Sequence, residues 1–418
     1  MLFLNRFFLL IPAIATITIA TELNPATAAS FEGLGFVAEQ LNTSKYEYSG
    51  VSLSDLSADG SMAVGTFSWF DTTTSYEGYE SFFWNRNTNE VSFVKDLTEN
   101  PLYGNAYRIS ADGSTIVGHT VESNGESGFI WDREAGIADI GTLYDQGYFL
   151  SPPRDLSADG STVVGVSADW EITGIVEAFI WNREDGIQGL GSYFADSLYN
   201  VANGVSEDGS IIVGTRNIDS DNFFSQDPLV LNRNNDSVTI IQGDESFIPD
   251  NASNISSDGS TVIGQGYAID PDSGRLFSGR EAFVWNEALG LQRLGDFAGG
   301  DIDSSANGIS ADGSMIVGTG ETDTGDLAFI WDAASGMRSL KDVLEQDYNL
   351  DLTGWTLESA TNISDDGSTI IGSGINPNGI GESWIATLSN NAAPVPESST
   401  LWGLALASLG IVVKNVGS

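Results

Sequence analysis

A motif of the form Ser-x-Asp-Gly-Ser, followed by apolar residues and glycine, occurs seven times and constrains the fold more than any other feature of the sequence. Its aspartates recur at intervals of 47 to 54 residues. They are Asp59, Asp112, Asp159, Asp208, Asp258, Asp312 and Asp366. Seven units of about 51 residues fill residues 30–390, and a repeat of this length is one supersecondary unit that buries its apolar face against its neighbours. The repeats therefore leave no room for a separate catalytic domain.

Each unit has the pattern of four short strands. Asp-Gly between extended segments is typical of a tight turn, because glycine adopts the positive φ that the turn needs. The first strand ends at the motif, and the others are exemplified by residues 115–118, 178–181 and 186–191. Consecutive apolar residues in the second and third strands indicate burial on both faces. Sheets stacked radially provide that burial, so we expect an all-β fold, a seven-bladed β-propeller of four-stranded blades.

The two ends of the repeat region predict how the ring closes. The seventh unit ends after residues 383–388 and lacks a fourth strand, whereas Phe-Glu-Gly-Leu-Gly at residues 31–35 is similar to Ile-Gln-Gly-Leu-Gly at 187–191. We therefore expect an N-terminal strand, about 31–36, to complete the last blade. An open array would need polar caps at both ends, and the sequence has none.

The aromatic strand also carries a family resemblance. Glu-Ala-Phe-Ile-Trp at residues 177–181 and Glu-Ala-Phe-Val-Trp at 281–285 resemble the His-Ala-Phe segment of the HAF-repeat family of bacterial extracellular proteins. The histidine is absent from every copy, and Leu231 and Ala386 replace the tryptophan in two units. The resemblance implies an exported repeat protein, and that family has no well-defined activity to transfer.

The N-terminal residues 1–29 have the pattern of a secretory signal. Arg6 supplies a positive charge, residues 7–20 are mostly apolar, and Ala-Thr-Ala at 26–28 is a cleavage motif, with 27–29 as a neighbouring option. A membrane anchor that stays uncut is the alternative interpretation. We expect cleavage because the apolar run is short for a bilayer span.

The C-terminal residues resemble a PEP-CTERM sorting signal. A linker at 391–394 precedes Val395, Pro396 and Glu397, then an apolar run at 401–413 and one lysine. Ser398 replaces the usual second proline, and the basic end is reduced to Lys414. The resemblance implies processing of the segment 395–418 by an exosortase-type enzyme. It also implies transient anchoring in the inner membrane before the protein reaches the cell surface or the extracellular space.

Composition excludes several classes of function. A formal net charge of −42 excludes nucleic acid as a partner, because phosphates need Lys and Arg. The absence of cysteine excludes disulfides and thiolate metal sites, and the single histidine, His119, excludes paired-histidine sites. We expect His119 at an exposed loop edge, as an incidental residue and not as a base. Because the repeat aspartates occur in every unit, we interpret them as turn formers and not as catalytic acids.

The candidate binding surface follows from the expected topology. In a propeller the loops between second and third strands share one rim, and loops of variable length on a rigid scaffold are a usual binding surface. These loops are residues 66–80, 119–127, 166–177, 215–227, 265–281, 319–327 and 373–382. Trp69 and Trp170 follow the second strand of their units, and Trp355 lies in a link between units. Such rings could stack on sugars, although ordinary packing is the alternative.

One of these loops has a partial calcium-binding pattern. Asn217, Asp219, Asp221 and Asp227 place oxygen ligands at alternating positions, as in calcium loops. Pro228 stands where that pattern needs a glutamate, so a solvated acidic loop is the alternative. Calcium is the cation that the sequence favours, because a strongly acidic surface attracts divalent ions.

Together these features predict an exported, non-catalytic propeller at the surface or in the matrix, which binds an extracellular polysaccharide or a surface protein through the variable-loop rim. The alternatives are a glycoside hydrolase or polysaccharide lyase that uses rim carboxylates, and a purely structural matrix protein. No residue cluster that breaks the repeat in one place stood out, which weighs against an enzyme.

Export predicts a mature chain that is shorter at both ends. We expect the secreted protein to begin at Ala29 or Ser30 and to lack the apolar C-terminal run, because the two terminal segments have the features of processed signals. Intact mass spectrometry of secreted material measures both ends. Recovery of the uncut chain from the extracellular fraction would contradict this prediction.

Overall fold

The computed structural model describes residues 28–35, 37, 40, 47–71, 76–94, 104–122, 125–144, 149–169, 174–194, 197, 199–217, 226–271 and 273–388. They fall almost entirely within one compact body, Ala29–Ser389. The predicted signal, apart from its last two residues, lies outside the described residues, as do the linker and the sorting motif Val395, Pro396 and Glu397.

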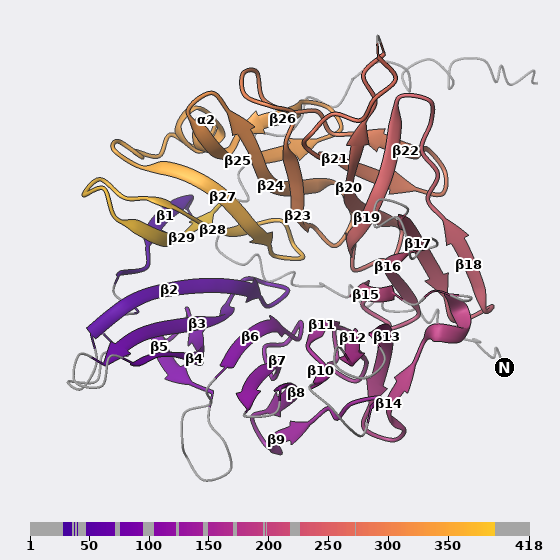
Figure 1. Ribbon diagram of the computed structural model, residues 1–418. Coiled ribbons are helices and arrows are strands. Elements are labelled where there is room, and N and C mark those ends of the chain that lie inside the picture. Colours follow the sequence, from indigo (N-terminus) through magenta and orange to yellow (C-terminus); the bar gives the residue numbers. More distant parts are fainter. Residues whose placement is uncertain are drawn as a thin grey trace, which may run out of the picture. The chain divides into compact units, whose positions relative to one another are not determined.

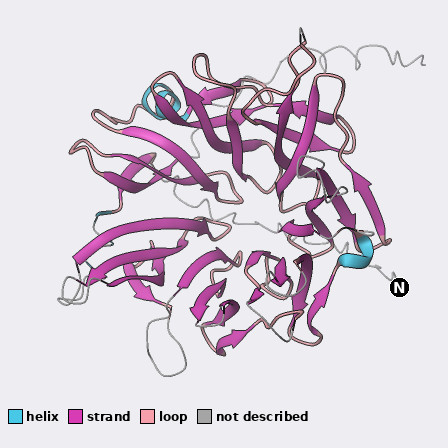
Figure 2. Ribbon diagram, in the orientation of Figure 1, coloured by secondary structure: helices cyan, strands magenta, loops and turns pink. Residues whose placement is uncertain are grey.

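The regular structure in the described part of the chain is almost all β-strand, which confirms the all-β prediction (Figure 2). We number the repeat units 1 to 7 by their Asp-Gly turns. Unit 1 contains β2 (Glu47–Leu56), β3 (Met62–Asp71), β4 (Tyr76–Asn85) and β5 (Glu90–Phe93). Unit 2 contains β6 (Gly104–Ile109), β7 (Thr115–Glu122), β8 (Gly125–Asp132) and β9 (Gly136–Asp139). Unit 3 contains β10 (Phe149–Leu150), β11 (Pro153–Leu156), β12 (Val163–Asp169), β13 (Ile175–Asn182), β14 (Gly186–Gly189) and the 3-10 helix η1 (Gly191–Tyr193).

The remaining units follow the same order. Unit 4 contains β15 (Tyr199–Val205), β16 (Ile211–Asn217), β17 (Gln226–Asn232) and β18 (Ser237–Ile240). Unit 5 contains β19 (Phe247–Ile255), β20 (Thr261–Ala268), β21 (Glu281–Asn286) and β22 (Gly290–Arg293). Unit 6 contains β23 (Ser304–Ile309), β24 (Met315–Thr322), β25 (Gly325–Asp332), β26 (Gly336–Ser339) and helix α2 (Leu340–Gln346). Unit 7 contains β27 (Thr356–Ile363), β28 (Thr369–Ile375) and β29 (Gly381–Thr387), and β1 (Ser30–Gly33) pairs with β29.

The first long strand of each unit faces a common centre (Figure 1). These inner strands are β2, β6, β11, β15, β19, β23 and β27, and each contacts the inner strand of the next unit, including β27 with β2. Four of the five sheets have four strands. The fifth has thirteen, because short parallel pairs, β8 with β10 and β13 with β15, join units 2, 3 and 4.

The Asp-Gly turns have the hydrogen bonds that the sequence predicts. In unit 2 the Asp112 carboxylate accepts from the Ser110 hydroxyl at 2.8 Å and from the Ser114 N–H at 2.9 Å. Gly113 has φ of 72°, a conformation that favours glycine. The same serine and backbone contacts to the aspartate occur in the other six units. The repeat aspartates are therefore turn formers, as expected.

Backbone hydrogen bonds join these turns into a closed cycle. The N–H of Ala58 donates to the carbonyl of Ala111, and the N–H of Ala111 donates to that of Ala158, both at 3.0 Å. The series continues through each following turn and ends where the Asp366 N–H donates to the Ala58 carbonyl at 3.2 Å. Because the last turn bonds to the first, every turn has a neighbour on both sides.

The apolar core lies between the units. Units 1 and 2 share a cluster that includes Val64 and Ile116, and Ile385 of unit 7 packs in one cluster with Leu53 of unit 1. The other consecutive pairs of units share similar clusters. The centroid of the Trp131 ring lies 5.5 Å from that of Phe83 in the preceding unit, an aromatic contact between units.

The N-terminal strand occupies the same place in unit 7 as β14 does in unit 3. Phe31 pairs with Ala386, and the Gly35 N–H donates to the Glu382 carboxylate at 2.7 Å. In unit 3 the Gly191 N–H donates in the same way to Glu177, at 3.1 Å. The strand is shorter than the expected 31–36, but its residues have the equivalence that the sequence suggested.

Every inner strand has a bulge at the same position of the repeat, a feature that the repeat pattern does not predict. In each unit the pairing of the inner strand with the second strand shifts at the residue five positions before the repeat aspartate. These residues are Ser54, Tyr107, Arg154, Asn203, Ser253, Asn307 and Thr361. A bulge inserts one residue that the partner strand does not match, and it re-aims neighbouring side chains.

Helix α2 is a second feature that the repeat pattern did not predict. It lies in the connection between units 6 and 7, where the Ser339 side chain caps it by accepting from the Asp342 N–H at 3.3 Å. Leu340, Val343 and Leu344 are its buried residues. No helix in the described part of the chain has the length and apolar composition that crossing a bilayer requires.

Substitution of Gly33 tests the contribution of β1. A Cβ atom at Gly33 would lie 2.7 Å from Glu382 Oε1 and 2.8 Å from the Trp355 ring, whereas a Cβ at Gly381 would have nothing within 4 Å. We expect Gly33→Val to lower the melting temperature by a few degrees, because overpacking costs about 1–3 kcal/mol. Gly381→Val is the matched control and should change it little. Equal melting temperatures for the two variants would contradict a structural role for β1.

Candidate functional site

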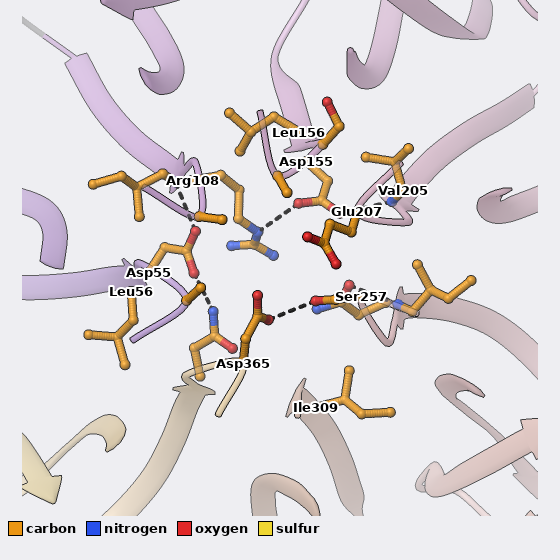
Figure 3. Close-up of a pocket in the computed structure, with 18 of the residues that line it drawn as sticks. Asp55, Leu56, Arg108, Asp155, Leu156, Val205, Glu207, Ser257, Ile309 and Asp365 are labelled. Carbon is orange, nitrogen blue, oxygen red and sulfur yellow. Dashed lines mark hydrogen bonds and ion pairs between the residues drawn. The ribbon is translucent and has the colours of Figure 1, made fainter. Parts of the chain in front are cut away.

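The inner strands end at a polar cavity of about 90 Å³, which has room for about three water molecules. Two sets of residues supply much of the cavity wall. One set lies four positions before the repeat aspartates, and the other lies directly before them. Six polar side chains of the wall are labelled in the close-up view. They are Asp55, Arg108, Asp155, Glu207, Ser257 and Asp365 (Figure 3).

Asp55 connects three units at this cavity. Its Oδ2 accepts from the Ile109 N–H of unit 2 at 2.8 Å, and its Oδ1 accepts from the Asn362 side-chain amide of unit 7. Burial raises the pKa of Asp55 to about 7, although the Arg108 charge and the backbone N–H groups of Ile109 and Leu56 act in the opposite direction. A buried carboxyl that holds two donors is a structural link between the first and last units.

Asp155 and Arg108 form a second link. Asp155 Oδ2 accepts from the Val205 N–H at 2.8 Å, and its Oδ1 lies 3.6 Å from Arg108 Nε. Burial raises the pKa of Asp155 to about 6, with Arg108 as the largest opposing influence. The Arg108 guanidinium thus lies between two buried carboxyls and stabilises their ionised forms.

Two further carboxyl groups lie at the cavity. Asp365 accepts from the Ser257 hydroxyl at 2.7 Å, and Glu207 faces the Arg108 side chain (Figure 3). The cavity therefore brings four carboxyl groups together with the Arg108 guanidinium and the Ser257 hydroxyl. It does not resemble a glycosidase site, because Asp55 and Asp155 already bind neighbouring units and the cavity is too small for a sugar ring.

Two of the three tryptophans that the sequence suggested, Trp69 and Trp355, pack against other side chains. Trp69 is buried, with 3% of its surface exposed, and its Nε1 donates to Glu80 at 3.1 Å. Trp355 is half-buried and packs edge-to-face on Phe31, with 5.1 Å between ring centroids. Trp170 lies outside the described residues. For Trp69 and Trp355 the structure therefore favours ordinary packing over sugar stacking.

The calcium pattern is only partly described. Asn217 is buried at the end of β16, and the Asp227 carboxylate accepts from Arg216 at 3.1 and 3.2 Å. Asp219 and Asp221 lie outside the described residues. Within the described ranges no group of three or more His, Asp or Glu side chains is placed to hold a metal ion.

His119 is buried, so its expected position at an exposed loop edge is wrong. Strand β7 runs on to Glu122, beyond the predicted 115–118, and this places His119 inside the sheet with 4% of its surface exposed. Its ring stacks on Tyr107 at 5.1 Å and lies 3.7 Å from the Glu126 carboxylate. Burial lowers the pKa of His119, with the Glu126 charge acting in the opposite direction.

The repeat pattern does not predict the cavity residues, because they lie outside the fixed positions of the motif. Comparing the variable position four residues before each repeat aspartate would have found them. That position holds Asp55, Arg108, Asp155, Gly204, Asn254, Gly308 and Asn362. At Gly308 a Cβ atom would lie 2.7 Å from Asn362 Oδ1, so the next unit's side chain explains why glycine is present there.

Comparison with solved structures identifies the fold. The β-propeller domain of the Trilobed protease from Pyrococcus furiosus matches with a TM-score of 0.53 and 12% identity, covering 85% of this chain and 100% of that domain. The oligogalacturonate lyase from Vibrio parahaemolyticus matches with a TM-score of 0.52 and 13% identity, covering 87% of this chain and 97% of the lyase. The fold is therefore a β-propeller, and at these identities the likeness extends to the fold alone.

No protein-family model matches the chain. No curated protein matches it either. Function must therefore be argued from the geometry of this molecule.

The buried carboxyl of Asp55 predicts how stability depends on pH. Because its pKa in the folded protein is about 7, the Asp55 carboxyl binds more protons in the folded than in the unfolded state between about pH 4 and pH 7, so it makes the free energy of unfolding fall as pH rises through this range. Replacing Asp55 with Asn should make this fall shallower, by up to about 1.4 kcal/mol per pH unit. Denaturant unfolding between pH 4.5 and pH 8 measures the slope.

Asp112→Asn is the control for this slope. The Ser114 N–H lowers the pKa of Asp112, so this carboxyl does not titrate in the same range. The control should keep the wild-type slope even if its overall stability changes. A wild-type slope in the Asp55→Asn variant would contradict the prediction.

Proposed function

We propose that this chain is an exported, non-catalytic, seven-bladed β-propeller that binds a protein partner through its variable-loop rim. Seven blades are supported by the seven turns and by the closed cycle of backbone hydrogen bonds between them. Closure by the N-terminal strand is supported by the pairing of β1 with β29. Export, cell-surface or extracellular location and exosortase processing rest on the HAF-repeat and PEP-CTERM resemblances of the sequence.

The contacts of the acidic and basic side chains support a non-catalytic role. Asp55 and Asp155 are engaged by neighbouring units, and the repeat aspartates form turns. The single histidine stacks on Tyr107, and its ring nitrogen Nε2 lies near the Asn105 amide and the Glu126 carboxylate. A nucleophile needs a base within hydrogen-bond reach, and a hydrolase needs free carboxyls beside a sugar-sized space.

The distribution of exposed apolar side chains carries the binding proposal. Among the described residues, six large hydrophobic side chains are strongly exposed. Four of them lie in the variable-loop ranges, and a fifth, Ile248 of β19, pairs with Tyr267 of the 265–281 range, so five lie on this rim. Those five are Tyr79, Ile248, Leu276, Phe277 and Ile380. The sixth, Leu289, lies in a turn between third and fourth strands, at the opposite rim. Exposed apolar residues concentrated on one face are typical of an interaction surface.

Unit 5 contributes three of these residues from adjoining backbone. Ile248 pairs with Tyr267, Leu276 forms a bridge with Ile269, and the Phe277 N–H donates to the Ala268 carbonyl at 2.9 Å. Aliphatic side chains such as Ile248 and Leu276 suit a protein partner better than a sugar, which favours flat aromatic faces. A polysaccharide ligand remains the second candidate because of the sorting-signal resemblance. The lyase likeness offers no catalytic group to this chain.

The experiment measures retention of the full chain on isolated envelopes of the cells that produce it. Leu276→Ser with Phe277→Ser should reduce retention at least tenfold, because it removes the apolar contact. Leu289→Ser is the matched control, since it changes an exposed leucine at the other rim, and it should bind as the wild type does. Protease treatment of the envelopes should abolish binding.

Other outcomes separate the alternatives. Binding that survives protease but is lost on polysaccharide digestion would replace the protein partner with a glycan. New reducing ends or unsaturated products would show an enzyme. Equal retention of the rim variant and the control would overturn the rim as the binding surface.

A further inference from the structure

Units 2 and 3 break the repeat pattern at one place. The bulged residue is Ser, Asn or Thr in the other five units, but Tyr107 in unit 2 and Arg154 in unit 3. At the position that follows the bulged residue, Arg108 of unit 2 is the one basic residue among the seven units. The position before the bulge is Ala in five units, but Pro153 in unit 3.

These changes remove a contact that other units make. In units 4 to 6 the bulged side chain donates to a carbonyl of the next unit: Asn203 to Ala252, Ser253 to Ala306 and Asn307 to Ala360. Within the described residues, neither Tyr107 nor Arg154 has a side-chain hydrogen bond of this kind. Instead both line a cavity of about 330 Å³ together with Arg108 and two prolines.

The two prolines of the cavity lie at an interruption of a strand. Pro152 lies between β10 and β11, where the inner strand of unit 3 is interrupted, and Pro153 is the first residue of β11. Proline has no N–H to donate and a fixed φ, so it ends regular strand pairing. The cavity lies beside this interruption, and its lining combines the two prolines with the Tyr107 side chain.

Arg154 is an available cation in a very acidic protein. The chain has 58 acidic and 16 basic side chains, yet in the part that the structure describes Arg154 is exposed and has no ion pair or side-chain hydrogen bond. By contrast, Arg108 lies 3.6 Å from Asp155 and donates to the Tyr107 carbonyl at 3.1 Å. A free guanidinium offers a planar pair of donors that matches a carboxylate.

The Tyr107 side chain lines the same cavity as Arg154 and is held in place by stacking. Its ring stacks on the buried His119 ring, with 5.1 Å between centroids. Burial raises the pKa of Tyr107 to about 12, so the hydroxyl stays protonated and can donate a hydrogen bond. A ligand here meets a guanidinium, a phenol donor and proline rings within one small space.

We propose that this cavity is a binding site for a carboxylate carried on a small, partly apolar frame, the chemistry of a sugar acid. Arg154 pairs with the carboxylate, while Tyr107 and the prolines contact the frame. This site is separate from the variable-loop rim, so it goes beyond the proposed function and does not depend on it.

Calorimetric titration of the full chain with sodium glucuronate and with glucose tests the site. We expect glucuronate to bind at millimolar concentration and glucose at least tenfold more weakly, because the two differ in the carboxylate. Arg154→Gln should weaken glucuronate binding at least tenfold without unfolding the protein, since the side chain is exposed. Arg275→Gln is the matched control, because Arg275 is another exposed arginine, in the 265–281 loop, and it should bind as the wild type does.

Three outcomes would overturn the proposal: equal binding of glucuronate and glucose, equal binding of phosphate and glucuronate, or unchanged binding in Arg154→Gln. The Leu276→Ser, Phe277→Ser variant should bind glucuronate normally. A failure at this cavity is therefore distinguishable from a failure of the rim proposal.

Discussion

The cycle of backbone hydrogen bonds between the Asp-Gly turns is the constraint on which the rest of the structure depends. Each turn receives one hydrogen bond and gives one, and the bond from Asp366 to Ala58 joins the last unit to the first. Because the chain has no cysteine, noncovalent contacts must hold the two ends together. The pairing of β1 with β29 and the apolar cluster that Leu53 shares with Ile385 add side-chain and strand contacts at the same junction.

Buried carboxyls at the centre have a cost that the surrounding groups reduce. Asp55 and Asp155 each accept a backbone N–H from the following unit, and one arginine lies between them. Burying a charge is unfavourable unless it is paired and hydrogen-bonded. The raised pKa values of both groups show that this compensation is incomplete near neutral pH. The centre is therefore polar because it links units, while the stabilising apolar area lies between the sheets.

The sequence was sufficient to predict the repeated turns and the N-terminal strand, but not the bulges that shape the central cavity. Ser110, Asp112 and Gly113 have a local role that turn chemistry predicts, and the similarity of residues 31–35 to 187–191 correctly indicated equivalent strands. The bulge was missed because alternation along a strand assigns consecutive residues to opposite faces. The sequence left Trp69 open between sugar stacking and ordinary packing, and its ring is covered by the fold because β3 extends through it.

Because of the repeated bulge, an inner strand can pair in its sheet while the side chain at the bulge varies. The residue at the bulge has no partner in the ladder, so a change of side chain there leaves the hydrogen bonds of the sheet in place. Tyr107 and Arg154 occupy this position without altering the turns that follow them. A chain built in this way can vary the chemistry of its interior one unit at a time. Its capacity for new ligands therefore grows with the number of repeats, while its folding rules stay the same.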